Sequence, residues 1–301
     1  MKKKCLIAAE VLWDCFPYGN FLGGATLNVA YHLSKLNTMP ILASSVGNDE
    51  LGKRALEQIN ELWNCDTSAI REIEHLETGR VDVEIDENGN AKYAIKTPAA
   101  WDEILLIDKQ LKYFFDTDAF VYPSVGLRFE YNRTQIKRFL KNYSGLKCFD
   151  ANIRLPHNTT EIVLEFARLA DFVKVNEDEL DLLIQLSAPN TSLNDKILKL
   201  ANILNIEMVC VTRAEKSAVM FYRGEFFEGA TYPIQVKDTV GAGDSFFAAM
   251  IDSLLNPNFN PAKALSRATA LGSWVASKAG AQPEYGDKNP NKGYIFVNHE
   301  T

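Results

Sequence analysis

The chain has 301 residues, of which 47% are hydrophobic, which is ample for a buried core and suits one large α/β domain or two small ones. Its formal net charge of −7 argues against a surface that binds nucleic acid or an anionic membrane. No apolar run is long enough to cross a membrane, and five scattered cysteines without a Cys-x-x-Cys pair predict reduced thiols in a cytoplasmic protein.

Short apolar runs and amphipathic segments alternate along most of the chain. The runs predict strands over residues 5–11, 40–47, 119–123, 146–150, 172–175 and 208–212. The amphipathic segments predict helices over residues 26–37, 49–63, 130–142, 159–170, 177–185, 193–204 and 261–279. This alternation predicts an α/β fold with a largely parallel central sheet flanked by helices. In such folds, ligands bind at the carboxyl ends of the strands.

The segment 79–95 has a different pattern. Three aliphatic residues alternate with acidic ones between residues 81 and 86, and the Asn-Gly-Asn at 88–90 has the composition of a hairpin turn. One-sided alternation predicts a small sheet outside the main α/β layers, with one face covering a ligand site. A plain surface hairpin is the alternative.

The stretch 238–250 carries the most specific pattern in the chain. A Gly-rich turn opens directly into an apolar helix, and Gly241 and Gly243 allow the backbone to approach a ligand closely. The first amides of a helix lack intrahelical partners and the helix dipole adds positive charge, so this turn predicts a phosphate site. Asp244 lies beside it, where a carboxylate would suit proton removal from a hydroxyl that attacks the phosphate. An ordinary turn with Asp244 as a helix cap is the alternative.

Polar side chains also lie next to other predicted elements. Asp14 and Asn28, on either side of the glycines at 23–24, could hold hydroxyl groups, because Asp accepts hydrogen bonds and Asn both donates and accepts them. Arg154, after the predicted strand 146–150, could clamp a phosphate or a carboxylate. Surface turns and capped helix starts are the alternatives, and residue types alone leave both open.

Two of these stretches resemble signatures of the ribokinase-like (PfkB) carbohydrate kinases. Residues 238–246, Asp-Thr-Val-Gly-Ala-Gly-Asp-Ser-Phe, resemble the C-terminal signature, and residues 23–30 resemble the N-terminal one. Residues 10–14, 30–33 and 100–104 look like fructokinase-type members in particular. The resemblance covers nearly the whole chain. It implies one ribokinase-like domain over residues 1–301 that transfers phosphate from ATP to a primary hydroxyl of a sugar, with D-fructose as the first candidate.

The resemblance also implies roles for individual residues. Asp244 would be the catalytic base, and the amides of Gly241, Ala242 and Gly243 would stabilise the moving phosphoryl group. The sugar would be held by Asp14, Gly23, Gly24, Asn28, Asn152 and Arg154. Asn176 and Glu179 would order Mg²⁺, unless they are only a capped helix start, and Thr212 would lie on the ATP side. A monovalent cation, K⁺ in our expectation, would bind at Asp238, Val240, Val275 and Gly280.

The family pattern further implies a lid, formed by about residues 12–22 and 79–101, that excludes water and through which many members dimerise. We therefore expect a homodimer. Three positions depart from the family pattern: Ala214 and Ser217 replace usual glycines, and Glu284 stands where Ser is common. The residues after 284 have no functional interpretation.

Other functions stay open on the sequence alone. One alternative is a kinase for another sugar, for 2-keto-3-deoxygluconate or for a nucleoside, and another is a sugar-binding pseudokinase without turnover. A P-loop NTPase is disfavoured because Gly-x-x-x-x-Gly-Lys-Ser/Thr does not occur. A dinucleotide enzyme is disfavoured because the Gly-rich turn is late in the chain and lacks the third glycine of Gly-x-Gly-x-x-Gly.

Overall fold

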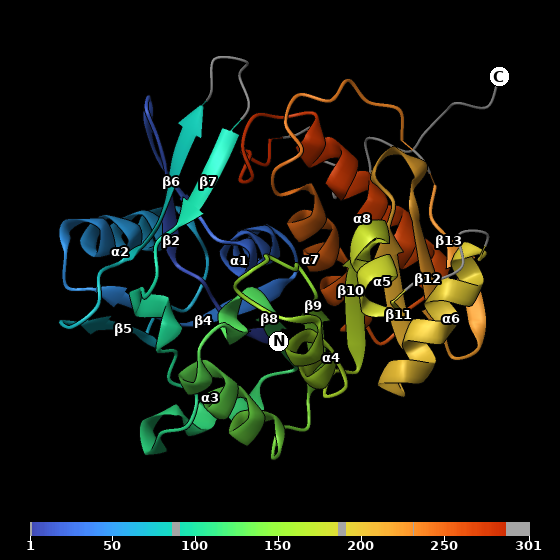
Figure 1. Ribbon diagram of the computed structural model, residues 1–301, viewed down its shortest axis with the longest axis horizontal. Helices are drawn as coiled ribbons and strands as arrows, with labels where there is room; N and C mark the ends of the chain where they lie inside the picture. Colours follow the sequence, from blue (N-terminus) through green and yellow to red (C-terminus); the bar gives the residue numbers. More distant parts are fainter. Residues whose placement is uncertain (1, 86–90, 186–190, 231, 287–301) are drawn as a thin grey trace.

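The computed structural model describes residues 2–85, 91–185, 191–230 and 232–286 (Figure 1). Within these residues the main sheet has nine strands in the order β13-β12-β11-β10-β9-β8-β1-β4-β5. The strands are β1 (Lys3–Ala8), β4 (Thr38–Gly47), β5 (Ile70–Ile73), β8 (Ala119–Pro123), β9 (Leu146–Asp150), β10 (Phe172–Asn176), β11 (Met208–Thr212), β12 (Ala218–Tyr222) and β13 (Glu225–Glu228). Every pairing from β5 to β11 is parallel, which confirms the predicted fold class, and β12 and β13 add an antiparallel edge.

Helices cover both faces of this sheet (Figure 1). One face carries α1 (Ala25–Lys35), α2 (Glu50–Leu62), α7 (Ala242–Leu254) and α8 (Pro261–Ala276), and the other carries α3 (Glu130–Leu140), α4 (Thr160–Ala167), α5 (Glu177–Leu183) and α6 (Leu193–Leu204). The sheet therefore separates two apolar cores. On β1, Cys5 and Ile7 point into the first core while Leu6 and Ala8 point into the second.

A second, smaller sheet stands at one side of the molecule, where β6 and β7 project beside α1 in Figure 1. Its strands are β2 (Leu12–Phe16), β3 (Gly19–Gly23), β6 (Gly79–Ile85) and β7 (Ala91–Ile95), in the order β3-β2-β6-β7. The predicted alternation is confirmed, since Val81 and Val83 are buried, whereas the expected turn at 88–90 lies outside the described residues. Periodicity alone did not predict β2 and β3, because their aromatic and polar residues do not alternate cleanly.

One buried ion pair fastens this small sheet to the main body. After β7 the chain forms a short helical turn, Ala100–Asp102, and the carboxylate of Asp102 lies 2.6 and 2.7 Å from two guanidinium nitrogens of Arg128. Arg128 also lies over the ring of Trp101, which belongs to the same small apolar cluster as Val81 of β6. The side chains of Asp102 and Arg128 are 4% and 2% exposed, so water screens this pair little.

The sequence prediction missed three strands of the main sheet and extended several helices too far at their C-terminal ends, α4 and α8 by three residues each. The β12–β13 hairpin turns at Arg223 and Gly224, both with positive φ, which is the geometry of a two-residue hairpin that Arg-Gly only weakly signals. The strand β5 is a short edge strand of four residues. The helix α8 ends at Ala276, three residues before the predicted end.

Parallel strands bring their carboxyl ends to one edge of the sheet. Asp150 ends β9, Asn176 ends β10 and Thr212 ends β11, and these three strands are neighbours. The polar residues that the sequence placed after separate strands therefore lie along one edge.

No helix of the described residues is long and apolar enough to cross a membrane, and none of the five cysteines forms a disulfide.

Candidate active site

The N-terminus of α7 lies at this edge, and its backbone has the geometry that the sequence predicted. Gly241 precedes the helix with φ 78°, and a Cβ there would lie 2.6 Å from Ala281, so the turn requires glycine. Among the hydrogen bonds of the described residues, none uses the amides of Gly241, Gly243 or Asp244. We expected the amide of Ala242 to be available to a phosphate as well, but it donates to the Thr239 carbonyl at 3.3 Å.

Asp244 is held by a side chain from the other end of the chain. The Nδ2 of Asn28, on α1, donates to Oδ2 of Asp244 at 2.8 Å. Gln282 donates to Oδ1 of Asn28 at 2.9 Å, which fixes the Asn28 amide so that its nitrogen faces the carboxylate. Burial raises the pKa of Asp244 to about 6, although the Asn28 hydrogen bond lowers it. A carboxylate with this pKa is a stronger base than an ordinary aspartate and is still ionised at neutral pH.

Asp14, Gly23 and Gly24 form a second group beside α1. A Cβ on Gly23 would lie 2.6 Å from Oδ2 of Asp14, so the glycine makes room for that carboxylate. Gly24 has φ 119°, and a Cβ there would lie only 1.9 Å from the Glu10 carbonyl oxygen. Burial raises the pKa of Asp14 to about 6. Gly24 caps the helix that carries Asn28, and Asn28 donates to Asp244, so α1 connects this group to Asp244.

A buried lysine that the sequence analysis missed lies at the centre of the site. Nζ of Lys174, on β10, lies 3.0 and 3.2 Å from the two carboxylate oxygens of Asp150. A Cβ on Gly243 would lie 3.3 Å from the same Nζ, which places the ammonium group next to the start of α7. Burial opposes its charge, but Asp150, Glu179 and Asp244 together raise the pKa of Lys174. The available signal was a lysine inside the otherwise apolar strand Phe172–Val175.

Asn176 and Glu179 form the helix cap that was the alternative interpretation. Oδ1 of Asn176 accepts the Glu179 amide at 2.8 Å, and Oε2 of Glu179 accepts the Asn176 amide at 2.9 Å. The other oxygen, Oε1, accepts the amide of Ile153 at 2.9 Å. Burial, followed by the charge of Asp150, raises the pKa of Glu179, while Lys174 lowers it. The two residues thus organise the backbone around the Asp150 end of β9.

Asn152 and Arg154 lie on the loop that follows β9. Asn152 has φ 29°, and its carbonyl accepts the hydroxyl of Ser124 at 3.2 Å. The Arg154 side chain is exposed, and the only hydrogen bond it makes among the described residues goes to the adjacent Ile153 carbonyl at 3.2 Å. Its charge nevertheless lowers the pKa of Asp244, so the guanidinium group lies within electrostatic reach of that carboxylate.

The turn after β11 contains two non-glycine residues with positive φ, a conformation that glycine adopts more readily. Thr212 ends the strand, and Ala214 and Ser217 have φ of 46° and 87°. Each of these conformations costs a non-glycine residue about 1–3 kcal/mol. The hydroxyl of Ser217 donates to the Gly229 carbonyl at 2.5 Å, which helps to hold the strained residue in place. Both positions that depart from the family's glycines therefore have positive φ, the conformation that glycine adopts most readily.

Asp238 ties the start of the Gly-rich turn to the end of α8. Its two carboxylate oxygens accept the amides of Val240 at 3.0 Å and Gly280 at 2.9 Å. The carbonyl of Val275 accepts the amide of Lys278 at 2.8 Å. The four residues expected around a monovalent cation thus lie in two adjacent segments. In the described part of the chain, no group of three His, Cys, Asp or Glu side chains is arranged to hold a metal ion.

His32 anchors the segment that follows Gly280. Its Nδ1 lies 2.7 Å from the Tyr285 hydroxyl and its Nε2 lies 3.0 Å from the Ala281 carbonyl oxygen. Burial lowers the pKa of His32 to about 3, so the ring is neutral and makes one bond as donor and one as acceptor. The helix α1 thereby holds the segment that carries Gln282.

Glu10 is the second buried polar residue that the sequence analysis did not assign to the site. Its Oε2 accepts the amide of Thr26 at 3.1 Å and the hydroxyl of Thr26 at 2.6 Å. Its Oε1 is buried and has no hydrogen-bond partner. Burial raises the pKa of Glu10 to about 7, because an ionised carboxylate is disfavoured there. Glu10 therefore fixes Thr26 in the first turn of α1, two residues before Asn28.

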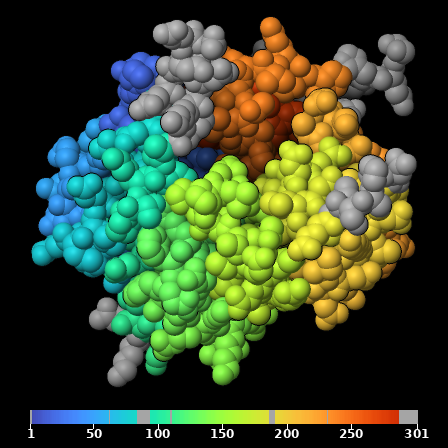
Figure 2. All heavy atoms as spheres, viewed as in Figure 1, coloured from blue at the N-terminus to red at the C-terminus, as the bar shows by residue number. Residues whose placement is uncertain are grey.

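A carboxylate with a raised pKa beside unpaired helix amides, at the carboxyl edge of a largely parallel sheet, is the arrangement of an enzyme that transfers a phosphoryl group to a hydroxyl. Figure 2 shows the surface hollowed at this place, between the yellow-green and the orange segments. The sequence profile of the pfkB family of carbohydrate kinases matches residues 3–287, and the chain belongs to this family. It is therefore a carbohydrate kinase.

Similar proteins from plants and bacteria are named as fructokinases. The chain is 30% identical over 280 residues to probable fructokinase-7 of Arabidopsis thaliana, covering 87% of this chain and 80% of that protein. It is 27% identical over 268 residues to the fructokinase of Escherichia coli, covering 84% and 85%. The structure of Vibrio cholerae fructokinase, bound to fructose, ADP and a calcium ion, has a TM-score of 0.79 at 21% identity, over 93% of this chain and 95% of that one.

The raised pKa of Glu10 predicts how stability depends on pH. Folding favours the protonated form, so the stability that Glu10 contributes is fully present below its unfolded pKa of 4.5 and is lost as pH rises through about 7. Glu10→Gln keeps a neutral side chain with an acceptor for Thr26. We expect the free energy of unfolding of this variant to fall less between pH 4.5 and 7 than that of the wild type, by roughly 3 kcal/mol in total.

Denaturant unfolding at several pH values measures this difference. The matched control is Glu57→Gln, which changes an exposed glutamate on α2 and should leave the wild-type dependence unaltered. If the free energy of unfolding depended on pH in the same way in Glu10→Gln and in the wild type, the burial of an uncharged Glu10 would be contradicted.

Proposed function

We propose that this carbohydrate kinase transfers the terminal phosphoryl group of ATP to a primary hydroxyl of D-fructose. The observation that carries the chemistry is the position of Asp244, one residue beyond the free amide of Gly243 and hydrogen-bonded to Asn28 at 2.8 Å. The names of the relatives support the sugar: the plant and E. coli relatives are named as fructokinases, and the V. cholerae structure holds fructose.

Asp244 acts as the general base in this proposal. The sugar hydroxyl binds within hydrogen-bond distance of the free lone pairs of its carboxylate, while Asn28 holds the oxygen Oδ2. The proton passes to Asp244 as the hydroxyl oxygen attacks phosphorus. The raised pKa makes this transfer more favourable than it would be to an exposed aspartate. Proton removal supplies only part of the rate enhancement, so the negative charge on the phosphoryl group also requires stabilisation.

The start of α7 and Lys174 supply that stabilisation. The unpaired amides of Gly241 and Gly243 are donors that need no reorganisation, and removal of one such donor typically costs about 10²–10³ in rate. The amide of Ala242 joins them if it gives up its long bond to Thr239. The buried ammonium group of Lys174 adds a full positive charge beside Gly243, held in place by Asp150.

Mg²⁺ and ATP fit the residues on the nucleotide side. Both oxygens of Glu179 already accept an amide, so each has one lone pair left, and the side chain can meet the hydration shell of an ion more readily than coordinate it. Mg²⁺ commonly keeps several waters and takes most other ligands from phosphates, which suits Asn176 and Glu179. The bound ion would neutralise phosphate charge. Thr212 and the strained turn at Ala214 and Ser217 would border the nucleotide.

The sugar site consists of the remaining assigned residues. Asp14 and Asn28 hold hydroxyls, and Gly23 and Gly24 admit the sugar to the backbone, because a side chain at either glycine would fill the space. Asn152 and Arg154 approach from the loop after β9. The small sheet acts as a lid that keeps water, a competing acceptor, away from the phosphoryl group.

The loop of Asp238 is the proposed site for K⁺. The amides of Val240 and Gly280 hold the Asp238 carboxylate in one orientation, and each of its oxygens keeps a lone pair for a cation. Carbonyls of Val240, Val275 and Gly280 would complete the ligand set. Because Gly241 packs against Ala281, an ion here would stiffen the turn that carries the phosphate amides.

Exposed aromatic residues on the small sheet support a homodimer, and the free cysteines support a location in the cytoplasm. Tyr18 and Phe21 are 69% and 53% exposed, and both lie in ring contact with Phe16 on the β2–β3 hairpin. Three neighbouring aromatic rings on a surface of a soluble enzyme are better explained as a protein contact than as solvent-facing residues. The five free cysteines suit a reducing compartment.

The substrate is tested by ADP release from the purified protein with Mg-ATP and K⁺. We expect selective turnover of fructose over ribose, tagatose, 2-keto-3-deoxygluconate and nucleosides. Selective turnover of another compound would overturn the choice of fructose while keeping the kinase chemistry. Sugar binding without ADP release from any compound would overturn the proposed turnover.

Asp244→Asn tests the base. The substitution keeps the shape and the hydrogen bond to Asn28 but removes the proton acceptor, so kcat should fall by about 10²–10⁴ while sugar binding persists. Asp178→Asn is a matched control, because Asp178 lies in the first turn of α5 just as Asp244 lies in the first turn of α7, but is exposed. Equal kcat values for the two variants would remove Asp244 from the base role.

The dimer is tested by light scattering after size-exclusion chromatography. The double variant Tyr18→Ser, Phe21→Ser should elute as a monomer, whereas the wild type should have the mass of two chains. The matched control is Tyr131→Ser, which changes a half-exposed aromatic residue on α3. A dimeric double variant would show that the subunits meet elsewhere.

A further inference from the structure

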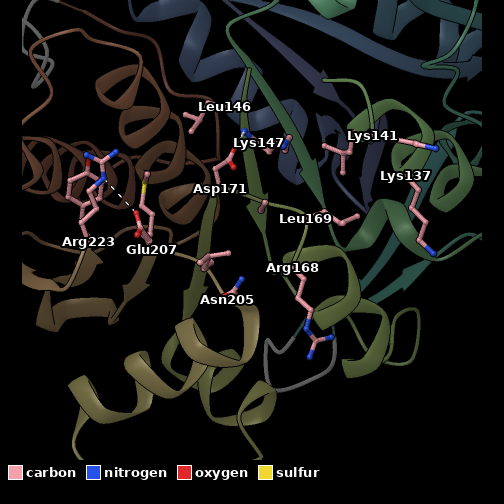
Figure 3. Close-up of a pocket in the computed structure, with 15 residues that line it drawn as sticks. Lys137, Lys141, Leu146, Lys147, Arg168, Leu169, Asp171, Asn205, Glu207 and Arg223 are labelled. Atoms are coloured by element: carbon pink, nitrogen blue, oxygen red, sulfur yellow. Dashed lines mark hydrogen bonds and ion pairs between the residues drawn. The ribbon is translucent and has the colours of Figure 1, made fainter. Parts of the chain in front are cut away.

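A cavity in the described residues lies at the edge of the main sheet opposite the candidate active site. Its volume is about 820 Å³, which is within the usual range of small-molecule sites. It is bordered by the first residues of β9 and β11, by the residues that lead from α4 into β10 and by the C-terminal end of α3 (Figure 3). Each of the three strands is five residues long, so this cavity and the active site are separated by about 13 Å or more of strand.

Cations predominate around this cavity in a protein whose overall charge is −7. Five cationic side chains line it, against two carboxylates, Asp171 and Glu207. The cations are Lys137, Lys141, Lys147, Arg168 and Arg223. In Figure 3, Lys137 and Lys141 lie on one side, Arg223 on the opposite side, and Lys147 between them. The local charge therefore has the opposite sign to that of the whole molecule.

Both carboxylates are already engaged. Oδ2 of Asp171 accepts the backbone amide of Lys147 at 2.9 Å, and the carboxylate of Glu207 lies 3.8 Å from Nε of Arg223. Their two negative charges offset only part of the five positive charges of the lining.

Three of the cations have no acidic partner in the described part of the chain: Lys141, Lys147 and Arg168. Lys137 differs, since it pairs with Glu165 at 2.7 Å. Arg168 uses only Nε, which donates to the Ile203 carbonyl at 3.2 Å, so the remaining guanidinium N–H groups stay available. Two ammonium groups and one guanidinium fork are thus available to an anion.

Helix dipoles explain some of these cations but not all. The helices α3, α4 and α6 all end at this edge, and the partial negative charge of a helix C-terminus favours nearby cations such as Lys141 and Arg168. Lys147 lies on β9, and Arg223 follows β12, so neither belongs to a helix end. Their presence at the same cavity favours a ligand as the common cause.

Apolar residues in the lining indicate the kind of anion. Leu146, Met208 and Tyr222 are half-buried, pack against the first core and contribute an apolar part of the wall. Lysines bind phosphate as mobile point charges, whereas arginine offers a planar fork that suits two phosphate oxygens. An apolar wall of this size suits a sugar or base ring better than a bare ion.

We propose that this cavity binds a small organic phosphate, with its phosphate groups at Lys141, Lys147 and Arg168 and its ring against Leu146, Met208 and Tyr222. A nucleotide and a sugar phosphate share this chemistry. Nucleic acid is a poorer match, because its long phosphate backbone would also meet the acidic remainder of the surface.

Amide chemical shifts of the full-length protein locate the binding and distinguish the ligand sources. The probes are inorganic phosphate, inorganic pyrophosphate, ADP and a hexose bisphosphate, each titrated to millimolar concentration. We expect an organic probe to shift the amides around Lys147 and Asp171 and to bind more tightly than either inorganic ion. Stronger binding of ADP would identify a nucleotide site, and stronger binding of the bisphosphate would identify a sugar-phosphate site.

The double variant Lys141→Gln, Lys147→Gln should weaken this binding by about tenfold or more, since it removes two direct charges. The charge-matched control is Lys53→Gln, Lys263→Gln, which neutralises two exposed lysines on α2 and α8 and should bind like the wild type. Thermal unfolding of both double variants reports whether the fold is intact.

Three results would overturn the proposal. The first is the absence of shifts around Lys147 and Asp171 with every probe. The second is equal affinity of the two double variants for the bound probe. The third is binding of the inorganic ions as tight as that of the organic probes, because the apolar wall would then contribute nothing.

Discussion

The hydrogen bond between Asn28 and Asp244 joins two parts of the chain that are 216 residues apart, and the active site depends on it. Asn28 comes from the first helix after β1, and Asp244 comes from the first turn of α7. Around this bond, Gln282 orients the Asn28 amide, His32 holds the segment that carries Gln282, and Glu10 fixes the start of α1. The carboxylate that we propose as the base is therefore positioned by contacts from both ends of the chain rather than by its own helix alone.

The electrostatics of the site follow from burial. Burial raises the pKa of Glu10, Asp14 and Asp244, since each carboxylate is removed from water with few donors to replace it. Asp150 differs because it pairs directly with the buried ammonium group of Lys174. The site thus combines a carboxylate with a raised pKa, suited to accept a proton, and a fixed positive charge, suited to face a phosphate. This separation of roles is consistent with a carbohydrate kinase.

The sequence predicted the sheet, most helices and the Gly-rich turn, because hydrophobic periodicity and glycine placement are local signals. It also predicted the small sheet through the alternation at Val81 and Val83. It did not predict Lys174 or Glu10 as parts of the site, because their significance depends on which strands and helices meet in space. The turn at Ala214 and Ser217 could not be predicted from residue type, since both non-glycine residues have positive φ in the structure. Asn176 and Glu179 show why a motif alone is ambiguous, since their side chains form a helix cap whether or not they also order Mg²⁺.

The pH dependence of kcat/KM for the sugar tests the central claim most directly, in the wild type and in Asn28→Leu. The account predicts that activity of the wild type falls on the acid side with an apparent pKa of about 6, as Asp244 becomes protonated. The Asn28 hydrogen bond lowers the pKa of Asp244, so its loss should move this limb to higher pH, in addition to any loss of sugar affinity. An acid limb that stays at the same pH in Asn28→Leu, or that lies near the ordinary aspartate value in the wild type, would contradict the account.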